Sequence, residues 1–410
     1  MTAALTADPA TAASTEELVA RFADVFDEVG AAAAERERER RLPYAEVETL
    51  RSAGFTRVSL PTGFGGSGAS HQTLFELLAE LARRDPNLAQ LFRSHFSYID
   101  RSLHQADPAV RDAALRRVAD GTIVGNASHE RSAAKVGSLD TRLTRDAAGG
   151  LSLSGTKYYS TGTLFADVVS VAAQDDAGDH VGVLVATDAP GVRRIDDWSG
   201  FGQRLTGSGT TVFDGVRVAE GDVVRHGRSD EPSHGAAFVQ LVLLAAVTGI
   251  GRAVVDDAVR FVRARTRVYS HGSGETARTD PIVQEAVGEL AARSFTADAA
   301  LAAATRGIDA SSAAILASAP LDERRRLVAA AETASVQAQL VILPAVLSAA
   351  TEMFEVGGAS ALDTGLALDR HWRNARTIAS HNPVRYKARA LGDQLLNETA
   401  IVNWWSTGEA

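Results

Sequence analysis

The sequence predicts an α+β protein made of separate helical and β-rich parts, and three observations support this prediction. Amphipathic helical patterns run through residues 1–120, short β-branched runs between Gly and Asp turns fill 121–230, and helical patterns return over 231–410. Because helices and strands are segregated along the chain, we expect separate layers or domains rather than a βαβ sheet. We therefore predict three domains with these boundaries.

The composition limits the class of protein. The 410 residues are enough for two or three domains, and their net charge of −9 is opposite in sign to that of most nucleic-acid-binding proteins. With no cysteine, disulfides, thiolate nucleophiles and cysteine-bound metals are excluded. The polar N-terminus does not resemble a signal peptide, and the apolar run 238–250 is interrupted by Gln240 and Thr248. We expect a cytoplasmic protein with no membrane or nucleic-acid partner.

Local signals place the helices of the first domain. Ser14 and Glu17 form a capping box ahead of apolar residues at helical spacing, and a second helix is expected to start near Tyr44. A third helix, over 74–81, ends at an Asp-Pro pair. The glycine-rich tract 63–68 lacks the Gly-Lys-Ser/Thr ending of a phosphate-binding loop and predicts a tight turn.

The other two domains are predicted from their residue composition and from the spacing of their apolar residues. Strands are expected at 151–153, 168–171, 181–185, 210–213 and 216–218. Long helices are expected over 241–265, from Asp280-Pro281 onward and through the alanine-rich stretch 295–350, and another over 364–396 with an interruption at 381–383.

No single motif specifies the chemistry. The chain has no His-x-x-x-His pair, so a metal site is not expected, and no Ser lies in a nucleophile elbow. His95 and His381 each lie among aromatic or small residues, a setting more typical of a structural histidine than of a catalytic one. Five further histidines are expected on the surface or in loops: His71, His104, His180, His226 and His234.

Several stretches that occur in a fixed order resemble the acyl-CoA dehydrogenase superfamily. They are Gly54–Gly66, Leu153–Gly162, Gly202–Val218, Arg265–Tyr269 and Met353–Gly358. Each is a weak signal alone, but their order covers nearly the whole chain. The resemblance implies a helical N-terminal domain, a β-barrel-like middle domain and a C-terminal four-helix bundle. It also implies a homotetramer that holds a flavin between the middle domain, the bundle and a neighbouring subunit.

One departure from the family argues against acyl-CoA dehydrogenation. Family dehydrogenases remove a proton with a Glu, and the two positions where this Glu is found correspond here to Asn382 and Gln240. An amide cannot accept that proton.

The run 371–387 instead resembles a branch of flavin monooxygenases that includes the dibenzothiophene monooxygenases. This resemblance implies a two-component enzyme, to which a separate flavin reductase supplies reduced FMN. Oxygen would add at flavin C4a, and one oxygen atom would pass from the hydroperoxide to sulfur, nitrogen or aromatic carbon of a small organic substrate. A neutral histidine in a dry pocket suits this chemistry better than a carboxylate. The resemblance to this branch favours FMN over FAD. The polar loop 270–279, which departs from the pattern that contributes to the adenosine half of FAD, points the same way.

The same resemblance implies roles for individual residues. His381 would lie beside flavin C4a as the main catalytic residue. The further catalytic residues would be His95, Ser160 and Asn126. The flavin would be held by Asn126, Ser128, Tyr158, Ser160, Arg267, Gly357, Gly358, Arg370 and Asn374. The substrate would be lined by His95, Tyr98 and Trp198.

Some alternatives stay open at this point. Arg373 fits a flavin contact and an inter-helix ion pair equally well, and Trp198 fits either a pocket wall or the packing of the middle domain. Two other functions are a desaturase or oxidase similar to acyl-CoA dehydrogenase, and a flavin-binding protein of this fold without catalysis. Product formation that depends on reduced FMN and oxygen would separate the monooxygenase from the dehydrogenase-like enzyme, and absence of flavin binding would favour the third function.

Overall fold

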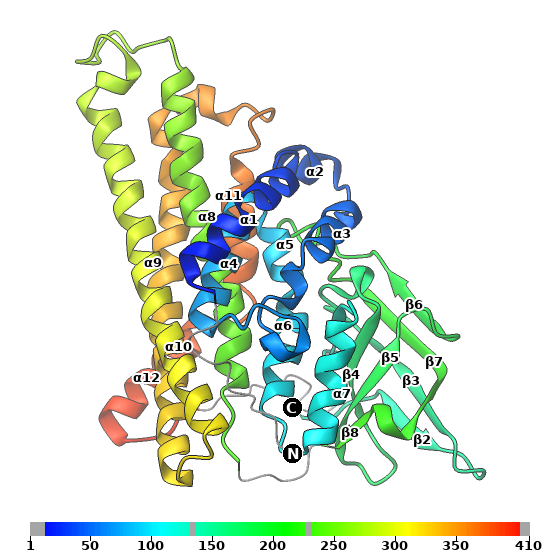
Figure 1. Ribbon diagram of the computed structural model, residues 1–410. Helices are drawn as coiled ribbons and strands as arrows, with labels where there is room; N and C mark the ends of the chain where they lie inside the picture. The colour runs from blue at the N-terminus through cyan, green and yellow to red at the C-terminus, as the bar shows by residue number, and fades with distance from the viewer. Residues whose placement is uncertain (1–12, 132–136, 226–230, 402–410) are drawn as a thin grey trace.

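The computed structural model, which describes residues 13–131, 137–225 and 231–401, contains a helical region, a sheet and a helical bundle (Figure 1). The N-terminal helices lie between the bundle on one side and the sheet on the other. The segregation of helices and strands that the sequence predicts is therefore confirmed, and the helical N-terminal region becomes the middle layer in space.

The N-terminal region begins and ends its helices where the sequence predicts. Ser14 and Glu17 form the reciprocal capping box of α1, and Asp85 caps α5 with Pro86 at its first position. The glycine-rich tract forms a short 3-10 turn in which Gly65 has a φ of 76°, a conformation that favours glycine. The elements are α1 (Thr15–Gly30), α2 (Ala33–Glu39), α3 (Tyr44–Ser52), η1 (Phe55–Arg57), η2 (Thr62–Phe64), α4 (His71–Arg84), α5 (Pro86–Leu91), α6 (Arg93–Leu103) and α7 (Pro108–Ala119).

The middle region is one mixed sheet of eight strands in the order β6-β7-β3-β2-β4-β5-β8, with β1 paired in parallel to β4. Strands β4 and β5 bury every second residue, the period expected of a sheet with one covered face. Over the described residues the end strands β6 and β8 do not pair with each other, so the sheet is not a closed barrel. The strands are β1 (Val124–Ala127), β2 (Arg142–Arg145), β3 (Leu151–Lys157), β4 (Val168–Gln174), β5 (His180–Ala186), β6 (Val192–Ile195), β7 (Thr210–Val218) and β8 (Val223–Arg225).

The C-terminal region is a bundle of three long helices, with two short ones in the fourth place. Helices α11 and α12 both contact α10, and the chain between them turns at 380–383. Pro383 causes this interruption, because the residue before a proline is disfavoured in helical conformation. The helices are α8 (Gly235–Ala264), α9 (Pro281–Leu316), α10 (Leu321–Glu352), α11 (Asp369–Ala379) and α12 (Val384–Asn397), with the short turns η6 (Met353–Val356) and η7 (Gly358–Leu362).

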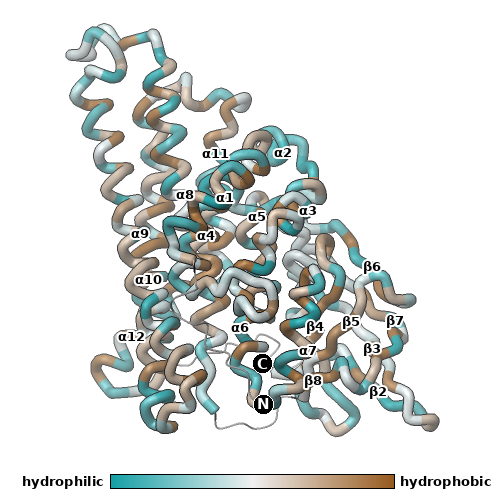
Figure 2. The backbone as a smooth tube through the Cα atoms, viewed as in Figure 1, coloured by the Kyte–Doolittle hydropathy of each residue, from teal (hydrophilic) through white to brown (hydrophobic). Residues whose placement is uncertain are grey.

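The hydrophobic core joins the N-terminal helices and the bundle. One continuous cluster contains buried residues from both, and the sheet buries a separate, smaller cluster. By length and composition α8 could cross a membrane, but 83% of its most apolar window is buried inside the protein. Its hydropathy is therefore explained by its place in the core, as Figure 2 shows where α8 passes α4. Helix α10 passes the same test with half of its window buried.

The contact between α4 and α8 is closer than side chains normally allow. A Cβ atom at Gly249 would lie 2.3 Å from the carbonyl oxygen of Ala79 and 2.5 Å from the Cβ of Ala82. The two backbones therefore approach each other at a point where only glycine fits, which sets the distance between the N-terminal helices and the bundle.

We predict that Gly249→Ala destabilises the protein by about 1–3 kcal/mol, because the added methyl group must separate α4 from α8. Gly288→Ala on α9 is the matched control, since a Cβ there meets nothing within 4 Å. The control should stabilise the protein by up to about 1 kcal/mol, because alanine favours a helix over glycine. Urea unfolding of the two variants measures both effects. Equal stability of both would show that α4 and α8 are not tightly packed.

Candidate active site

The loop after β3 holds the first part of the site. The backbone N–H of Tyr158 donates to the carbonyl of His129 at 2.8 Å, and that of Ser160 donates to the carbonyl of Gly209 at 3.1 Å. Tyr159 between them has a φ of 57°, which is rare for a bulky residue and typical of a locally constrained site. The Ser160 hydroxyl is buried and has no hydrogen-bond partner in the described part of the chain.

Strand β1 brings two further predicted residues to this loop. The Thr163 hydroxyl accepts from the backbone N–H of Asn126 at 3.1 Å and donates to its carbonyl at 2.9 Å, while the N–H of Thr163 donates to the carbonyl of Ser160. The Ser128 hydroxyl donates to Oδ1 of Asn126 at 2.6 Å. Asn126, Ser128, Tyr158 and Ser160 therefore lie in one neighbourhood at the sheet's edge.

His381 approaches from the turn between α11 and α12 and contacts a residue that the sequence analysis missed. Nη1 of Arg93, at the start of α6, donates to Nε2 of His381 at 2.9 Å. Because a guanidinium can only donate, Nε2 is the acceptor and the ring proton lies on Nδ1. An arginine at the start of a buried, aromatic-rich helix was the available signal for this contact.

The electrostatic environment keeps His381 neutral. Desolvation, together with the nearby charge of Arg93 and the neighbouring His129, lowers the pKa of His381 to about 3. Burial, then Arg93 and Lys157, also lower the pKa of His129. His129 thus lies close to both Arg93 and His381, and its carbonyl holds Tyr158. This chain of contacts connects His381 to the loop after β3.

The two positions where family dehydrogenases carry the catalytic Glu are amides that bond to each other. Nδ2 of Asn382 donates to Oε1 of Gln240 at 2.5 Å, and Nε2 of Gln339 donates to the carbonyl of Asn382 at 3.2 Å. The place of the base is therefore filled by a neutral hydrogen-bonded pair. Glu332 on α10 accepts from the backbone N–H of Ala237, which lies about one turn before Gln240 at the N-terminus of α8. Burial raises the pKa of Glu332 to about 7.

His95 has a structural position, which its setting in the sequence favours over the catalytic role that the resemblance implies. It is fully buried, its Nε2 donates to the carbonyl of Thr56 at 2.7 Å, and its Nδ1 accepts from the N–H of Val124 at 3.3 Å. Both ring nitrogens are therefore occupied, and the expected place of His95 on the substrate side is corrected. Tyr98 lies one turn further along α6, where its hydroxyl accepts from Arg117 at 3.2 Å.

Helix α11 carries three residues that the sequence analysis offered as flavin contacts, and in the structure their side chains bond to other residues of the chain. Arg370 pairs with Asp257 at 2.7 Å, and Oδ1 of Asn374 accepts from the N–H of Gln203 at 2.6 Å. Arg373 pairs with the buried Glu37 at 3.0 Å, so the ion-pair alternative holds for it. Burial raises the pKa of Glu37, and the neighbouring Asp85 raises it further.

Two other groups near α11 bear on ligand binding. Gln203 is buried, and neither atom of its side-chain amide has a partner in the described chain. Trp198 donates to the carbonyl of Gly202 at 3.3 Å and packs against Tyr159, with ring centroids 5.9 Å apart. Trp198 is therefore engaged in packing the end of the sheet beside the loop after β3.

Arg267, Gly357 and Gly358 lie at the opposite end of the bundle. A Cβ at Gly357 would meet the ring of Phe261 and one at Gly358 the hydroxyl of Tyr269, so these glycines pack beside the end of α8. Helix α8 has 30 residues and is therefore about 45 Å long, and Gln240 lies near its start. These three residues cannot contact a flavin beside His381 of the same chain.

A cavity of about 460 Å³ opens at the end of β3, and its lining includes Tyr158, Lys157, Glu130 and Arg131. Its size is that of a small-molecule site. The Arg131 guanidinium lies 4.1 Å from the centre of the Tyr158 ring, a favourable cation–π contact. Lys157 pairs with Glu130 at 2.6 Å.

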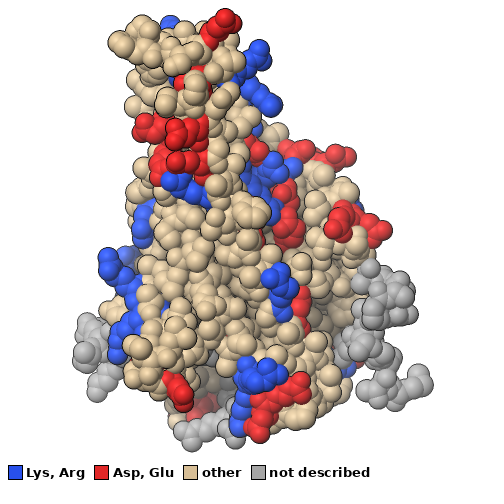
Figure 3. Space-filling view, turned by 90° about the vertical axis from the view of Figure 1, so that its left-hand side faces the viewer, with Lys and Arg blue, Asp and Glu red and all other residues tan. Residues whose placement is uncertain are grey.

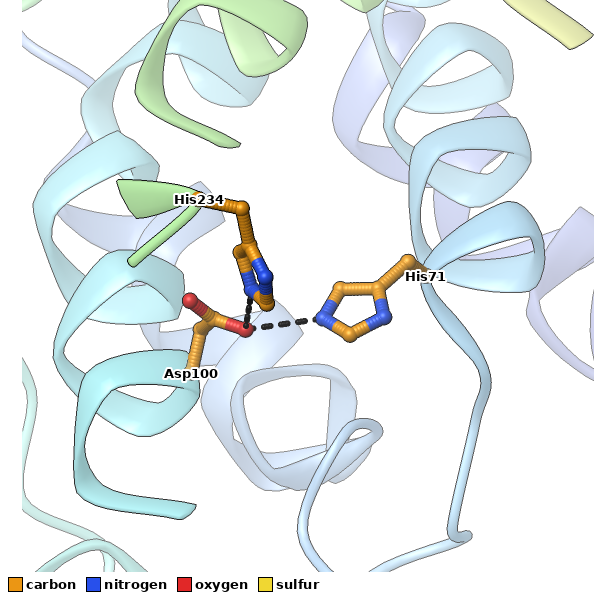
Figure 4. Close-up of side chains that lie close together, drawn as sticks. All are labelled: His71, Asp100 and His234. Atoms are coloured by element: carbon orange, nitrogen blue, oxygen red, sulfur yellow. Dashed lines mark hydrogen bonds and ion pairs between the residues drawn. The ribbon is translucent and has the colours of Figure 1, made fainter. Parts of the chain in front are cut away.

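Three histidines that were expected on the surface or in loops, His71, His104 and His234, instead join a network between the helices, which is a correction. Figure 4 shows His71 and His234 at the carboxylate of Asp100. Oδ1 of Asp100 lies 2.8 Å from Nε2 of His71 and 3.2 Å from Nε2 of His234, and the other nitrogen of His71 lies 3.0 Å from Asp309. Nε2 of His104 and the hydroxyl of Ser312 share a hydrogen bond of 2.8 Å. The residues come from α4, α6, α9 and the start of α8, so the network joins the N-terminal helices to the bundle. Tertiary contacts between distant segments create it, and no local pattern could show it.

The other two histidines in that group differ. His180 is exposed and bonds the carbonyl of Gly137 at 3.0 Å, as expected for a surface residue. His226 lies outside the described residues.

By spacing, His71, Asp100 and His234 could hold a metal ion, since their ligand atoms all lie within 4.8 Å of one another. The hydrogen bonds favour a proton-linked network, because His71 lies between two carboxylates. Burial opposes the charge on His71, but the bonds to Asp100 and Asp309 outweigh it and raise the pKa of His71 to about 9.

Comparisons with known proteins agree with this geometry. Residues 12–122 match the family model of the acyl-CoA dehydrogenase N-terminal domain, and 241–386 match that of the C-terminal domain. The chain is 31% identical over 374 residues to the dibenzothiophene monooxygenase of Mycolicibacterium goodii, covering 86% of this chain and 87% of that one.

Solved structures show the same likeness. Methanesulfinate monooxygenase MsuC of Pseudomonas fluorescens superimposes with a TM-score of 0.84 at 27% identity, over 94% of this chain and 98% of that one. TdsC of Paenibacillus sp. A11-2, solved with FMN and indole, superimposes with a TM-score of 0.83 at 26% identity, over 93% and 97% of the two chains.

The network around His71 makes a prediction about pH. Its folded pKa of about 9 lies above the ordinary value of 6.5, so its contribution is complete below pH 6.5 and is lost as pH rises toward 9. We expect His71→Gln to cost about 2–3 kcal/mol of unfolding free energy at pH 6 and much less at pH 9.5. Urea unfolding at the two pH values measures this. The exposed His271→Gln is the control, and a cost of His71→Gln that did not change with pH would contradict the network.

Proposed function

This chain belongs to the acyl-CoA dehydrogenase family, and within it we propose that it is an FMNH2-dependent monooxygenase that transfers one oxygen atom to a small organic substrate. The observation that carries the proposal is the neutral His381 beside the bonded pair Asn382–Gln240, where a dehydrogenase needs a carboxylate. The dibenzothiophene and methanesulfinate monooxygenases that the chain resembles, and the FMN in TdsC, support it.

The side chains of the site fit a flavin. The Ser160 hydroxyl and the Gln203 amide are buried without partners, and a buried polar group without a partner is costly unless a ligand satisfies it. Within the described residues, Nδ2 of Asn126 also has no hydrogen-bond partner, while Ser128 occupies its Oδ1. Ser160, Asn126 and Ser128 would hold the polar edge of the ring, and Tyr158 would lie against it. When bound, reduced FMN supplies the electrons that activate dioxygen.

The protein's part of the reaction lies in protection and proton placement. His381 keeps its proton on Nδ1 and offers it as a neutral donor, with Nε2 held by Arg93. A charged carboxylate here would destabilise a negatively charged oxygen nearby, whereas neutral amides at Asn382 and Gln240 do not. Arg93 and Ser160 are buried, whereas His381 is exposed in the single chain, so a bound flavin and a neighbouring subunit would have to exclude water and limit loss of the activated oxygen.

The complete site would need a second subunit. Arg267, Gly357 and Gly358 lie too far along α8 to serve the flavin beside their own His381, so we propose that they bind the flavin phosphate of a neighbouring chain. Apolar side chains available for assembly include Phe295, 73% exposed, and Leu396, 83% exposed. Figure 3 shows a broad uncharged area on the outer side of the bundle. We propose a homotetramer.

Three parts of the proposal concern partners and location. The reduced flavin would be supplied by a separate reductase and diffuse to this protein, and dioxygen would be the second substrate. We place the protein in the cytoplasm, where a reductase has access to reduced nicotinamide. A dehydrogenase-like reaction is disfavoured by the amide pair, and a silent flavin-binding role by the neutral His381 held in place.

Rapid mixing tests the proposal. Protein loaded with FMNH2 is mixed with oxygenated buffer, and flavin absorbance is followed against time. We expect flavin reoxidation to be slower than for free FMNH2, because the dry site protects the reacting oxygen. Reoxidation at the rate of free flavin would contradict the monooxygenase and lead back to an acyl-CoA screen.

His381→Ala should separate oxygen transfer from flavin binding. We expect substrate oxygenation to fall by about 100-fold or more, the range lost when a positioned acid–base group is removed. Hydrogen peroxide release should rise, while the FMN dissociation constant stays within a few-fold. The exposed His180→Ala is the control. An unchanged ratio of product to peroxide would remove His381 from this role.

Ser160→Ala should have opposite effects on the free and the flavin-bound protein. Removing a buried hydroxyl without a partner should leave the flavin-free protein equally or slightly more stable, and FMN affinity should fall by roughly 5- to 10-fold for one lost hydrogen bond. Thermal unfolding and FMN titration measure the two effects. Ser152→Ala, at a partly exposed position on β3, is the control. Unchanged FMN affinity would show that Ser160 does not contact the flavin.

A further inference from the structure

We propose that the substrate carries a negative charge, and that the Arg93 guanidinium binds its anionic group directly beside His381. This inference rests on the proposed monooxygenase function and adds the chemical class of the substrate: a small organic anion with an oxidisable atom close to a carboxylate, sulfinate or similar group.

Arg93 is a buried cation without an anion. Its side chain is 8% exposed, and its single hydrogen bond within the described chain is the one to the neutral His381. No carboxylate of the described residues forms an ion pair with it. Burial lowers the pKa of Arg93 to about 10, so the group is still charged at neutral pH. A largely buried charge whose only partner is a neutral ring is unfavourable, and an anionic ligand that reaches its remaining donors would offset this cost.

The other buried cations of the described chain differ from Arg93. Arg36 pairs with Asp85 at 2.9 Å, Lys157 pairs with Glu130 at 2.6 Å, and Lys387 lies in the field of Glu332. The fold thus compensates its internal positive charges where they serve structure. Arg93 is the exception, and it is the one that touches the proposed catalytic histidine.

The guanidinium has donors to spare. One of its five N–H groups bonds His381. The other donors make no hydrogen bond in the described chain, and they are still accessible to a ligand, unlike the sealed hydroxyl of Ser160. The planar fork of a guanidinium matches the paired oxygens of a carboxylate or sulfinate. An anion held there lies next to His381, so the oxidised atom must be close to the charged group.

Helix α6 directs Arg93 toward the bundle. Asp100, seven residues later, lies on the same helical face and bonds His71 and His234, whereas His95 and Tyr98 turn to the sheet and α7. The donors proposed for the flavin come from the sheet. Arg93 comes from the helical side, together with His381, and therefore reaches the site from the side on which a substrate would lie.

Two probes of equal shape test the charge. Benzenesulfonate is anionic and methyl phenyl sulfone is its neutral counterpart, and neither needs to be oxidised to bind. Isothermal titration of the FMN-loaded protein should show at least about 10-fold tighter binding of the anion. Arg93→Gln should weaken benzenesulfonate by about 30-fold or more, as expected for loss of one partner of a buried charge pair, and change the sulfone by less than 2-fold. Arg116→Gln removes a charge that is 68% exposed and should change neither.

Two results would overturn the inference. If wild-type protein binds both probes with equal affinity, it has no anion site, and the result for Arg93→Gln does not change that conclusion. An Arg93→Gln protein that loses FMN affinity by the same factor, with the probes' relative affinity unchanged, would show that Arg93 serves the flavin.

Turnover separates this inference from the proposed function. With FMNH2 and oxygen, benzenesulfinate gains one oxygen atom to become benzenesulfonate, while the second oxygen atom leaves as water and FMNH2 becomes FMN. Methyl phenyl sulfoxide, which is neutral, gives the sulfone in the same way. We expect faster conversion of the sulfinate. Conversion of the sulfoxide alone would reject the anionic substrate and keep the monooxygenase, whereas failure to bind FMN would reject the monooxygenase.

Discussion

The close contact between α4 and α8 at Gly249 is the constraint on which the other parts of the structure depend. It lets the N-terminal helices and the bundle share one hydrophobic core, so that α6 lies between the bundle and the sheet. At the start of α8 the same interface carries the network of Asp100, His71 and His234. Apolar packing therefore sets the distance between the layers, and the polar network fixes their register.

The position of α6 decides the electrostatics of the site. Its first residue, Arg93, holds His381 in the tautomer with the proton on Nδ1, and its positive charge helps to keep that ring neutral. A carboxylate close to His381 would compensate Arg93 and also bring back a base. The fold instead places the amides of Asn382 and Gln240 there, bonded to each other. Charge and hydrogen bonding together favour oxygen chemistry over proton abstraction.

The length of α8 separates the site into two parts. His381 and the loop with Ser160 lie near its start, while Arg267 and Gly358 lie beyond its end. In the proposed enzyme, each end of the bundle would supply half of a flavin site. Assembly of several chains is thus part of the proposed chemistry, in which the exposed apolar residues on α9 and α12 would bring the two halves together.

The sequence by itself determined the order of helical and β-rich regions along the chain, the helix caps at Ser14 and Asp85, and the amides in place of the catalytic carboxylate. These are local properties, since caps and periodicity depend on residues a few positions apart, and the amides are read directly from the motif. Only the tertiary structure decided that Arg93 touches His381 across 288 positions, that backbone groups occupy both ring nitrogens of His95, and that His71 lies between two carboxylates. Whether a charge is buried and paired depends on which distant segments come into contact. The packing of the layers determines those contacts, and the pattern within a single layer does not.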